Sequence, residues 1–200
     1  GLGLLKESLR LLQDVETIKL DATPAGREVY VKLGFADEYR LSRMVGQFAN
    51  PFMFTGSKAR TVTKHDWPLL LMFDRQVFGA CRKSLLEWMF AGAPESAFLL
   101  SDSNGILGYC FGRPGQHYNQ IGPVVARNIA IAKELVSVAL KQCVGKAVII
   151  DALHFDKEWL SWLESVGFKE QRPFIRMYKG SNQIAGSPEN QFAISGPEFG

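Results

Sequence analysis

The sequence has few of the side chains that build metal sites and disulfide frameworks. Its 200 residues include three cysteines, Cys81, Cys110 and Cys143, an odd number without CxxC spacing. This pattern favours reduced thiols, and hence a cytoplasmic protein, over a set of structural disulfides. The three histidines lie in separate segments with no ligand spacing around them, so we expect no metal in this protein.

An excess of charge and a long apolar run are absent as well. Lys and Arg number 23 against 20 Asp and Glu, for a net charge of +3, which is too balanced to indicate a nucleic-acid-binding surface. The longest apolar stretch, residues 67–73, is far shorter than the roughly 20 residues that cross a bilayer. We therefore expect neither a nucleic acid nor a membrane as a partner. With 46% hydrophobic residues, the chain has ample material for a buried core.

What the chain does contain is an internal repeat. Residues 17–44 and residues 147–177 share an apolar run closed by Asp, a helical stretch, a Gly-Phe pair and an Arg-Met pair. The spacing from Gly-Phe to Arg-Met is the same in both copies. The repeat predicts two related structural units in one chain.

The first copy is shorter than the second at its beginning. A constant offset aligns Asp21 with Asp151, and it aligns the leucine-rich residues 2–13 with the helical residues 129–143. What precedes that helix in the second copy has no counterpart in the first. We therefore expect the first unit to be truncated at its N-terminus.

Local signals predict a helix, strand, helix, strand order in the first copy. Leucines at helical spacing indicate a helix at the start. Thr23 is placed as an N-cap with Pro24 at the first helical position, and Gly34 is placed to end that helix. The polar, proline-containing stretch that follows is the expected boundary between copies. The ranges are a helix at 2–13, strands at 17–20 and 35–44, and a linker at 46–57.

The second copy predicts a strand, two helices on one sheet face, a meander of three strands, and then helix, strand, helix, strand. Ser103-Asn104-Gly105 has a composition suited to a tight hairpin turn. Strands that alternate with helices after a meander indicate an α/β protein with a mixed sheet and helices on both faces. The predicted strands are 59–63, 97–101, 106–112, 120–126, 148–151, 168–178 and 192–194, and the helices begin at 66–68 and span 80–91, 128–143 and 157–166.

This order, together with the motif LDATPAGREVYVKLGF and its degenerate second copy, resembles the GNAT superfamily of acyl-CoA N-acyltransferases, in particular members with two tandem units. The fragments FDRQVFGACRKSLL, GYCFGRPG, IGPVVA and QFAISGPEFG are similar to the C-terminal unit of such proteins. The resemblance implies a GNAT-like fold with one complete unit preceded by the C-terminal half of another. It assigns residues 1–45 to the half unit, 46–57 to the linker and 58–200 to the complete unit.

The family holds the pyrophosphate of its donor on a Gln/Arg-x-x-Gly-x-Gly/Ala loop at a helix start, and Gly1-Leu2-Gly3 matches the end of that loop. Glycines let a backbone approach a pyrophosphate closely, and the free N–H groups and helix dipole favour its charge. This argument applies to any diphosphate. The resemblance implies acetyl-CoA as the ligand, whereas the alternative interpretation is a frayed helix start.

Tyr30 lies where the family places the tyrosine that protonates the departing coenzyme A thiolate. A phenol with an ordinary pKa of about 10 can donate a proton at neutral pH. The alternative is a core tyrosine that uses its apolar ring. The second copy has Leu163 at this position, which suggests that the first copy is catalytic.

The second copy also lacks glycines at its helix start, where Ile131 and Lys133 replace Gly1 and Gly3. Asn128 is a candidate helix cap, and Arg127 is either a phosphate contact or a solvated side chain. Asp74, Arg75 and Arg82 are candidate substrate ligands, and the alternative is an ion pair between Asp74 and Arg82.

The resemblance implies direct transfer of an acetyl group from acetyl-CoA to a primary amine on a small molecule, without a covalent enzyme intermediate. The residues do not identify the general base. The alternative is a non-catalytic GNAT-like module for structure or interaction that no longer binds coenzyme A. Because a half unit leaves apolar edges exposed, self-association is one of the expected arrangements.

Overall fold

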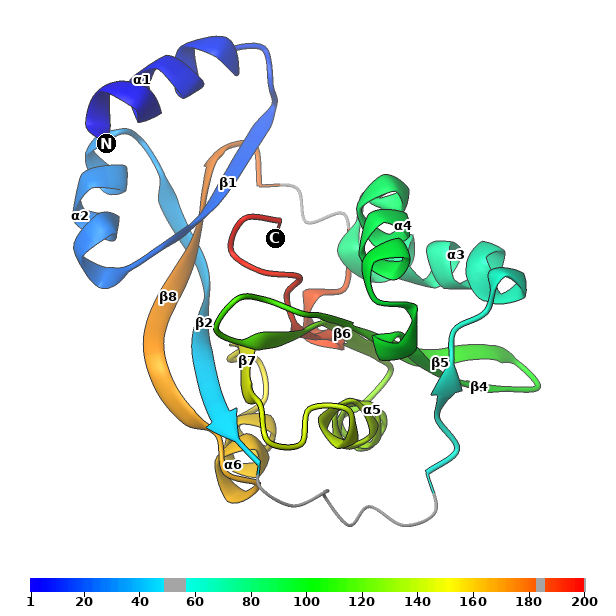
Figure 1. Ribbon diagram of the computed structural model, residues 1–200. Coiled ribbons are helices and arrows are strands. Elements are labelled where there is room, and N and C mark those ends of the chain that lie inside the picture. The colour runs from blue at the N-terminus through cyan, green and yellow to red at the C-terminus, as the bar shows by residue number, and fades with distance from the viewer. Residues whose placement is uncertain (49–56, 183–185, 200) are drawn as a thin grey trace.

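The computed structural model describes residues 1–48, 57–182 and 186–199. The described residues form a mixed α/β fold in which one large, mainly antiparallel sheet carries helices on both faces (Figure 1). The order of the strands across the sheet is β1-β8-β2-β7-β9-β6-β5-β4-β3. The predicted fold class is thus confirmed as a mixed α/β sheet.

The first 47 residues fold as the local signals predict. The Thr23 hydroxyl caps α2 by accepting a hydrogen bond from the Gly26 N–H at 3.1 Å. Gly34 follows this helix with φ at +85°, a conformation that glycine adopts without strain. The elements are α1 (Leu2–Leu11), β1 (Thr17–Ala22), α2 (Pro24–Lys32) and β2 (Ala36–Gln47).

The remaining elements confirm the predicted order, with boundaries shifted by a few residues. The hairpin of β4 and β5 is antiparallel and turns at Asn104, with Gly105 at φ +125°. The elements are β3 (Arg60–Thr61), α3 (Trp67–Phe78), α4 (Lys83–Gly92), β4 (Phe98–Asp102), β5 (Gly105–Arg113), β6 (Asn119–Ala126), α5 (Ile129–Lys141), β7 (Ala147–Leu153), α6 (Lys157–Ser165), β8 (Lys169–Gly180) and β9 (Gln191–Ala193). Short 3-10 turns lie at Lys64–Asp66, Pro94–Ser96 and Pro188–Asn190.

The predicted linker at 46–57 begins inside a strand. Residues Gly46 and Gln47 are still paired with β7, so β2 continues past the expected boundary. Positions 49–56 of this stretch lie outside the described residues.

The repeated segments exchange strands. β8 lies between β1 and β2, and β2 lies between β8 and β7, so each segment's two strands are separated by a strand from the other. Figure 1 shows β2 and β8 as two long strands that run side by side. The two segments therefore share one continuous sheet.

Two ion pairs, each with a buried aspartate, cross this exchange. Asp21 on β1 lies opposite Arg176 on β8 and is bound by it at 2.6 Å. Asp151 on β7 lies opposite Arg43 on β2 and is bound by it at 2.8 Å. Because the two aspartates match in the repeat, as do the two arginines, each segment's carboxylate is paired with the other's guanidinium. A buried carboxylate needs such a partner, so the pairs fix which strands meet.

The β2–β8 pairing contains two bulges at matching positions of the repeat. Glu38 is the extra residue on β2, and Gln171 is the extra residue on β8. A bulge changes the direction in which the extra side chain points and is common beside active sites. Each bulge places one polar side chain beside a crossed ion pair.

Each sheet face has its own apolar core. α3 and α4 pack with Leu70, Leu86 and Tyr109 on one face, and α5 and α6 pack with Leu135 and Trp159 on the other. A smaller cluster beneath α1 and α2 contains Ala22, Phe35 and Met177.

Helix α1 is largely exposed and, like α2, has no buried residue. Leu4 and Leu11 are 76% and 69% exposed. Across the described ranges, no helix combines the length and apolar character that a bilayer span requires.

The crossed ion pairs predict a difference between two conservative substitutions. Asp21→Asn leaves Arg176, with its side chain 6% exposed, as an uncompensated buried charge, and it should lower the free energy of unfolding by about 3–5 kcal/mol. Glu7→Gln, which breaks the exposed pair with Arg10, should leave stability nearly unchanged. Denaturant unfolding of both variants measures the difference, and equal small effects would show that the crossed pair contributes nothing.

Candidate active site

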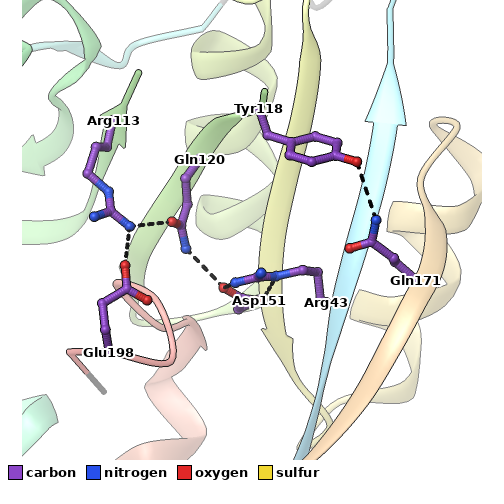
Figure 2. A network of polar contacts seen from close by, with 7 residues as sticks. All are labelled: Arg43, Arg113, Tyr118, Gln120, Asp151, Gln171 and Glu198. Carbon is purple, nitrogen blue, oxygen red and sulfur yellow. Dashed lines mark hydrogen bonds and ion pairs between the residues drawn. The ribbon is translucent and has the colours of Figure 1, made fainter. Parts of the chain in front are cut away.

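A network of polar side chains joins three strands near the centre of the sheet (Figure 2). Asp151 accepts from Arg43 Nε at 2.8 Å and from Arg43 Nη2 at 2.9 Å. It also accepts from Gln120 Nε2 on β6 at 2.9 Å. The hydrogen bond to Asp151 raises the pKa of Arg43, which therefore stays charged. Since both oxygens of Asp151 are engaged and its side chain is fully buried, this carboxylate organises the network and does not act as a base.

The network extends to the C-terminal segment. Arg113 Nη2 donates to Gln120 Oε1 and to Glu198 Oε1, both at 2.6 Å. Gln171, the bulge residue of β8, donates to the Tyr118 hydroxyl at 3.5 Å (Figure 2). Arg113, Tyr118, Gln120 and Glu198 line a cavity of about 340 Å³. The cavity is polar, but both oxygens of the neighbouring Asp151 are already hydrogen-bonded, so this carboxylate is not available to a ligand.

The crevice between the parallel strands β6 and β7 is filled by the chain itself. β6 and β7 pair directly only from Asn119–Ile121 to Val148–Ile150, and beyond this point β9 lies between them. Trp159 Nε1 donates to the Phe192 carbonyl at 3.0 Å. A Cβ at Gly122 would lie 2.1 Å from the Ile194 carbonyl oxygen. Ligands of open α/β sheets bind in such a crevice, at the carboxyl ends of the strands, and here β9 occupies that space.

The helix that follows β6 is capped from within. Asn128 Oδ1 accepts from the Ile131 N–H at 3.1 Å, which confirms the predicted cap. Arg127 donates to the Ile106 carbonyl at 3.2 Å and lies over the Phe73 ring. Arg127 is an exposed residue, as the solvated interpretation predicts, and these contacts fix its guanidinium against the protein surface.

Gly1, Leu2 and Gly3 lie at the start of α1. Gly1 is the N-cap and is exposed, without a side-chain cap. A Cβ at Gly1 or Gly3 would meet no atom within 4 Å, so the packing of the described residues does not itself require glycine there. Open backbone at a helix start fits a diphosphate, and the assignment of these residues stays a prediction.

Tyr30 lies half-buried on α2, beneath β1 and β8. Its ring meets the Phe35 ring edge-on, with the two ring centroids 6.0 Å apart, and packs with Ala22 and Met177. Leu9 of α1 packs against the same cluster, so α1 and Tyr30 share one small core. Leu163, the matching residue of the second copy, is fully buried in the main core. The position keeps its place in the fold in both copies, but only the first carries a hydroxyl.

Asp74 and Arg82 form a buried ion pair, the second of the two predicted interpretations. Arg82 Nη2 donates to Asp74 Oδ1 at 2.8 Å. The Tyr109 hydroxyl donates to the same carboxylate, and burial raises its pKa well above the ordinary value. Arg82 Nη1 also donates to Ser195 Oγ at 3.4 Å. The pair therefore joins α3 to the C-terminal segment, and the sequence spacing alone did not indicate this.

Ser42, His154 and Glu170 meet although they are distant in sequence. Ser42 Oγ donates to Glu170 Oε2 at 2.6 Å and lies 2.8 Å from His154 Nε2. The serine stands between the other two groups and is fully buried, whereas a nucleophilic triad needs the histidine in the middle. The cluster is therefore structural. Among the described residues, no three His, Cys, Asp or Glu side chains are grouped so as to hold a metal ion.

Comparison with known proteins identifies the fold family. The sequence profile of the acetyltransferase (GNAT) domain matches residues 70–193, which is more than half of the chain. The chain belongs to the GNAT acetyltransferase family.

Individual GNAT proteins match almost the whole chain. Holothin acyltransferase from Pseudoalteromonas sp. (strain SANK 73390) is 29% identical over 201 residues, which cover 100% of this chain and 67% of that protein. A Pyrococcus horikoshii protein described as an acetyltransferase superimposes with a TM-score of 0.77 at 26% identity, over 99% of this chain and 65% of that one. A GCN5-related N-acetyltransferase from Sphaerobacter thermophilus superimposes with a TM-score of 0.67 at 17% identity, over 93% of this chain and 71% of that one. The chain thus spans about two thirds of the length of these GNAT relatives.

The burial of His154 predicts a pH-dependent contribution to stability. Desolvation lowers the pKa of His154 below its ordinary value of 6.5. The unfolded chain then takes up a proton at a higher pH than the folded chain, so the contribution is complete above pH 6.5 and is lost as the pH falls through the folded pKa. Between about pH 7.5 and about pH 5, wild type should lose more free energy of unfolding than His154→Gln.

Denaturant unfolding at the two pH values gives this difference. His65→Gln, which removes an exposed histidine, controls for the loss of one imidazole. Equal losses in wild type and His154→Gln would contradict the prediction.

Proposed function

We propose that this protein is an N-acyltransferase that moves an acetyl group from acetyl-CoA to the primary amine of a small molecule. Membership of the GNAT family supports acyl transfer from a coenzyme A thioester. The relative named holothin acyltransferase supports a small-molecule acceptor. Three free thiols among the described residues fit a reducing cytoplasm as the location.

The protein has two tandem GNAT units, with residues 1–45 the C-terminal half of the first and 58–200 the second. The strand exchange and the crossed pairs Asp21–Arg176 and Arg43–Asp151 support this division, because matching residues of the repeat occupy matching positions in one sheet. The first unit is catalytic and the second shapes it.

The observation that carries this division of labour is the position of β9. A ligand that entered the crevice between β6 and β7 would have to displace Phe192, Ala193 and their hydrogen bonds. The capped start of α5 and the apolar Leu163 point the same way. In the first unit, by contrast, the start of α1 has no side-chain cap, and Tyr30 carries a hydroxyl where the second unit has Leu163.

In this mechanism the chain's own groups bind the donor and move one proton. Acetyl-CoA supplies an activated thioester, so the protein has to orient the two substrates and needs no nucleophile of its own. The N–H groups of Gly1, Leu2 and Gly3 bind the pyrophosphate at the start of α1. The Tyr30 hydroxyl donates its proton to the departing sulfur as the amine takes the acyl group. The nitrogen releases one proton to water, and the Tyr30 phenolate takes one back from water.

A non-catalytic interaction module is the second candidate. The filled crevice favours it, as do the exposed leucines of α1 and the free edge of β1, which are suited to a partner or a second copy. Calorimetric titration of acetyl-CoA into the 200-residue chain and into the full-length protein encoded by its gene separates the two. Saturable binding by the full-length protein supports the enzyme, and no binding by either supports the module.

Gly3→Ala separates a structural role of this glycine from a binding role. Gly3 lies within α1 and nothing crowds its Cβ position, so alanine should raise helix stability by up to about 1 kcal/mol. If Gly3 lets the backbone approach a pyrophosphate, the same change should weaken acetyl-CoA binding to the full-length protein at least about tenfold. Thermal unfolding and calorimetry measure the two effects, and unchanged binding would contradict the assigned role.

Tyr30→Phe tests the proton donor. The change keeps the ring that packs on Phe35 and removes only the hydroxyl. We expect kcat of the full-length protein to fall about 10²–10⁴-fold, with the Kd of acetyl-CoA unchanged. Tyr178→Phe, which removes a hydroxyl from β8 outside both cavities, is the control, and equal losses in both variants would argue against a specific role for Tyr30.

A further inference from the structure

A cavity of about 310 Å³ lies between the first repeated segment and the end of α3. Its size is at the lower end of the range for small-molecule sites, roughly 300–1,000 Å³. Its floor is formed by β1, β2 and β8, and its wall by α3 and the segment that leads into β9. The lining residues used below are Lys19, Glu38, Tyr39, Phe78, Arg176 and Gln191.

Glu38 brings an unsatisfied acceptor to this cavity. It is the bulge residue of β2, and its side chain is only 4% exposed. Lys19 Nζ donates to Glu38 Oε1 at 2.7 Å, whereas Glu38 Oε2 is buried and has no hydrogen-bond partner among the described residues. An unpaired buried carboxylate oxygen is costly, so it indicates a partner that the chain itself does not supply.

Gln191 brings an unsatisfied donor to the same cavity. This residue is 5% exposed, and its Nε2 has no hydrogen-bond partner within the described part of the chain. Gln191 begins β9, which fills the crevice of the second unit. One ligand with an N–H group and an oxygen would satisfy both atoms.

The other charges around the cavity are already balanced. Arg176 binds both oxygens of Asp21, and Lys19 binds Glu38. The cavity therefore has no net excess of charge and does not demand a cationic ligand. The Phe78 ring gives it an apolar wall, and burial raises the pKa of Tyr39 to about 12, so its hydroxyl stays protonated.

The matching bulge of the second segment lacks these features. Gln171 replaces Glu38 in the repeat and donates to Tyr118, and Ile149 replaces Lys19. The second bulge thus offers neither a carboxylate nor a lysine to a ligand. The difference ties the unsatisfied pair to the segment that also carries Tyr30.

We propose that this cavity binds the acceptor substrate, with Glu38 Oε2 accepting a hydrogen bond from its primary amine and Gln191 Nε2 donating to a second polar group. The acceptor is a primary amine that carries a hydrogen-bond acceptor and an apolar body against Phe78. The inference rests on the proposed transfer to an amine and adds the site and the chemical class of its substrate.

The test uses phenylalaninamide, a small molecule with a primary amine, a carbonyl oxygen and an apolar ring, and 3-phenylpropanamide, which lacks only the amine. Calorimetry on the full-length protein should show that phenylalaninamide binds at least about tenfold more tightly than 3-phenylpropanamide. Glu38→Gln should remove this preference. Asp37→Asn, which alters the neighbouring exposed acid paired with Arg27, should keep it.

Gln191→Leu provides a second variant in case Glu38→Gln perturbs the fold. It should weaken phenylalaninamide binding about tenfold and leave phenethylamine, which has no carbonyl, unaffected. No binding of phenylalaninamide by wild type, or an unchanged preference in Glu38→Gln, would overturn the proposal. Acetyl-CoA is titrated in a separate experiment. If acetyl-CoA binds and phenylalaninamide does not, the acceptor site is wrong and the proposed acyltransferase function is unaffected. If phenylalaninamide binds and acetyl-CoA does not, the acyltransferase function is wrong and the binding site stands.

Discussion

Two aspartate–arginine pairs with buried carboxylates hold the two halves of this molecule in one sheet. Asp21 meets Arg176 and Asp151 meets Arg43, and each pair joins strands that belong to different copies of the repeat. Because a buried charge is tolerated only beside its partner, a slip of one of these strands by one residue would leave the carboxylate and the guanidinium of its pair without each other. The pairs therefore specify the register of β1, β8, β2 and β7, and with it the position of the bulges.

The bulges and the C-terminal segment depend on that register. Glu38 and Gln171 are extra residues at matching points of the central strand pair. Glu38 lines one cavity, and Gln171 donates to Tyr118, which lines the other. The C-terminal segment passes between these cavities, and Gln191 and Glu198 contribute to one each. The same scaffold thus presents two different sets of polar groups, one with an unsatisfied carboxylate and one that is internally satisfied.

Local structure was predictable from the sequence because its signals are local. Thr23, Pro24 and Gly34 define the ends of α2 by capping and backbone preference alone, and Asn128 does the same for α5. The repeat indicated Asp21, Arg43, Asp151 and Arg176 as a matched set. It did not reveal that they pair across the copies, because strand exchange depends on contacts between residues more than one hundred positions apart. The roles of β9 and Gln191 were hidden for the same reason, since a short terminal strand has no pattern that names its neighbours.

The place of β8 in the sheet also affects how the protein is made. β1 has β8 as its hydrogen-bonding neighbour among the described strands, and residues 17–22 cannot pair until residues 175–180 have left the ribosome. Contacts of such long range slow folding, and unpaired edges attract other chains in the meantime. The first segment must therefore wait with its strands open while the residues between β1 and β8 are synthesised. Chaperones that shield edge strands are expected to bind the nascent chain during this interval.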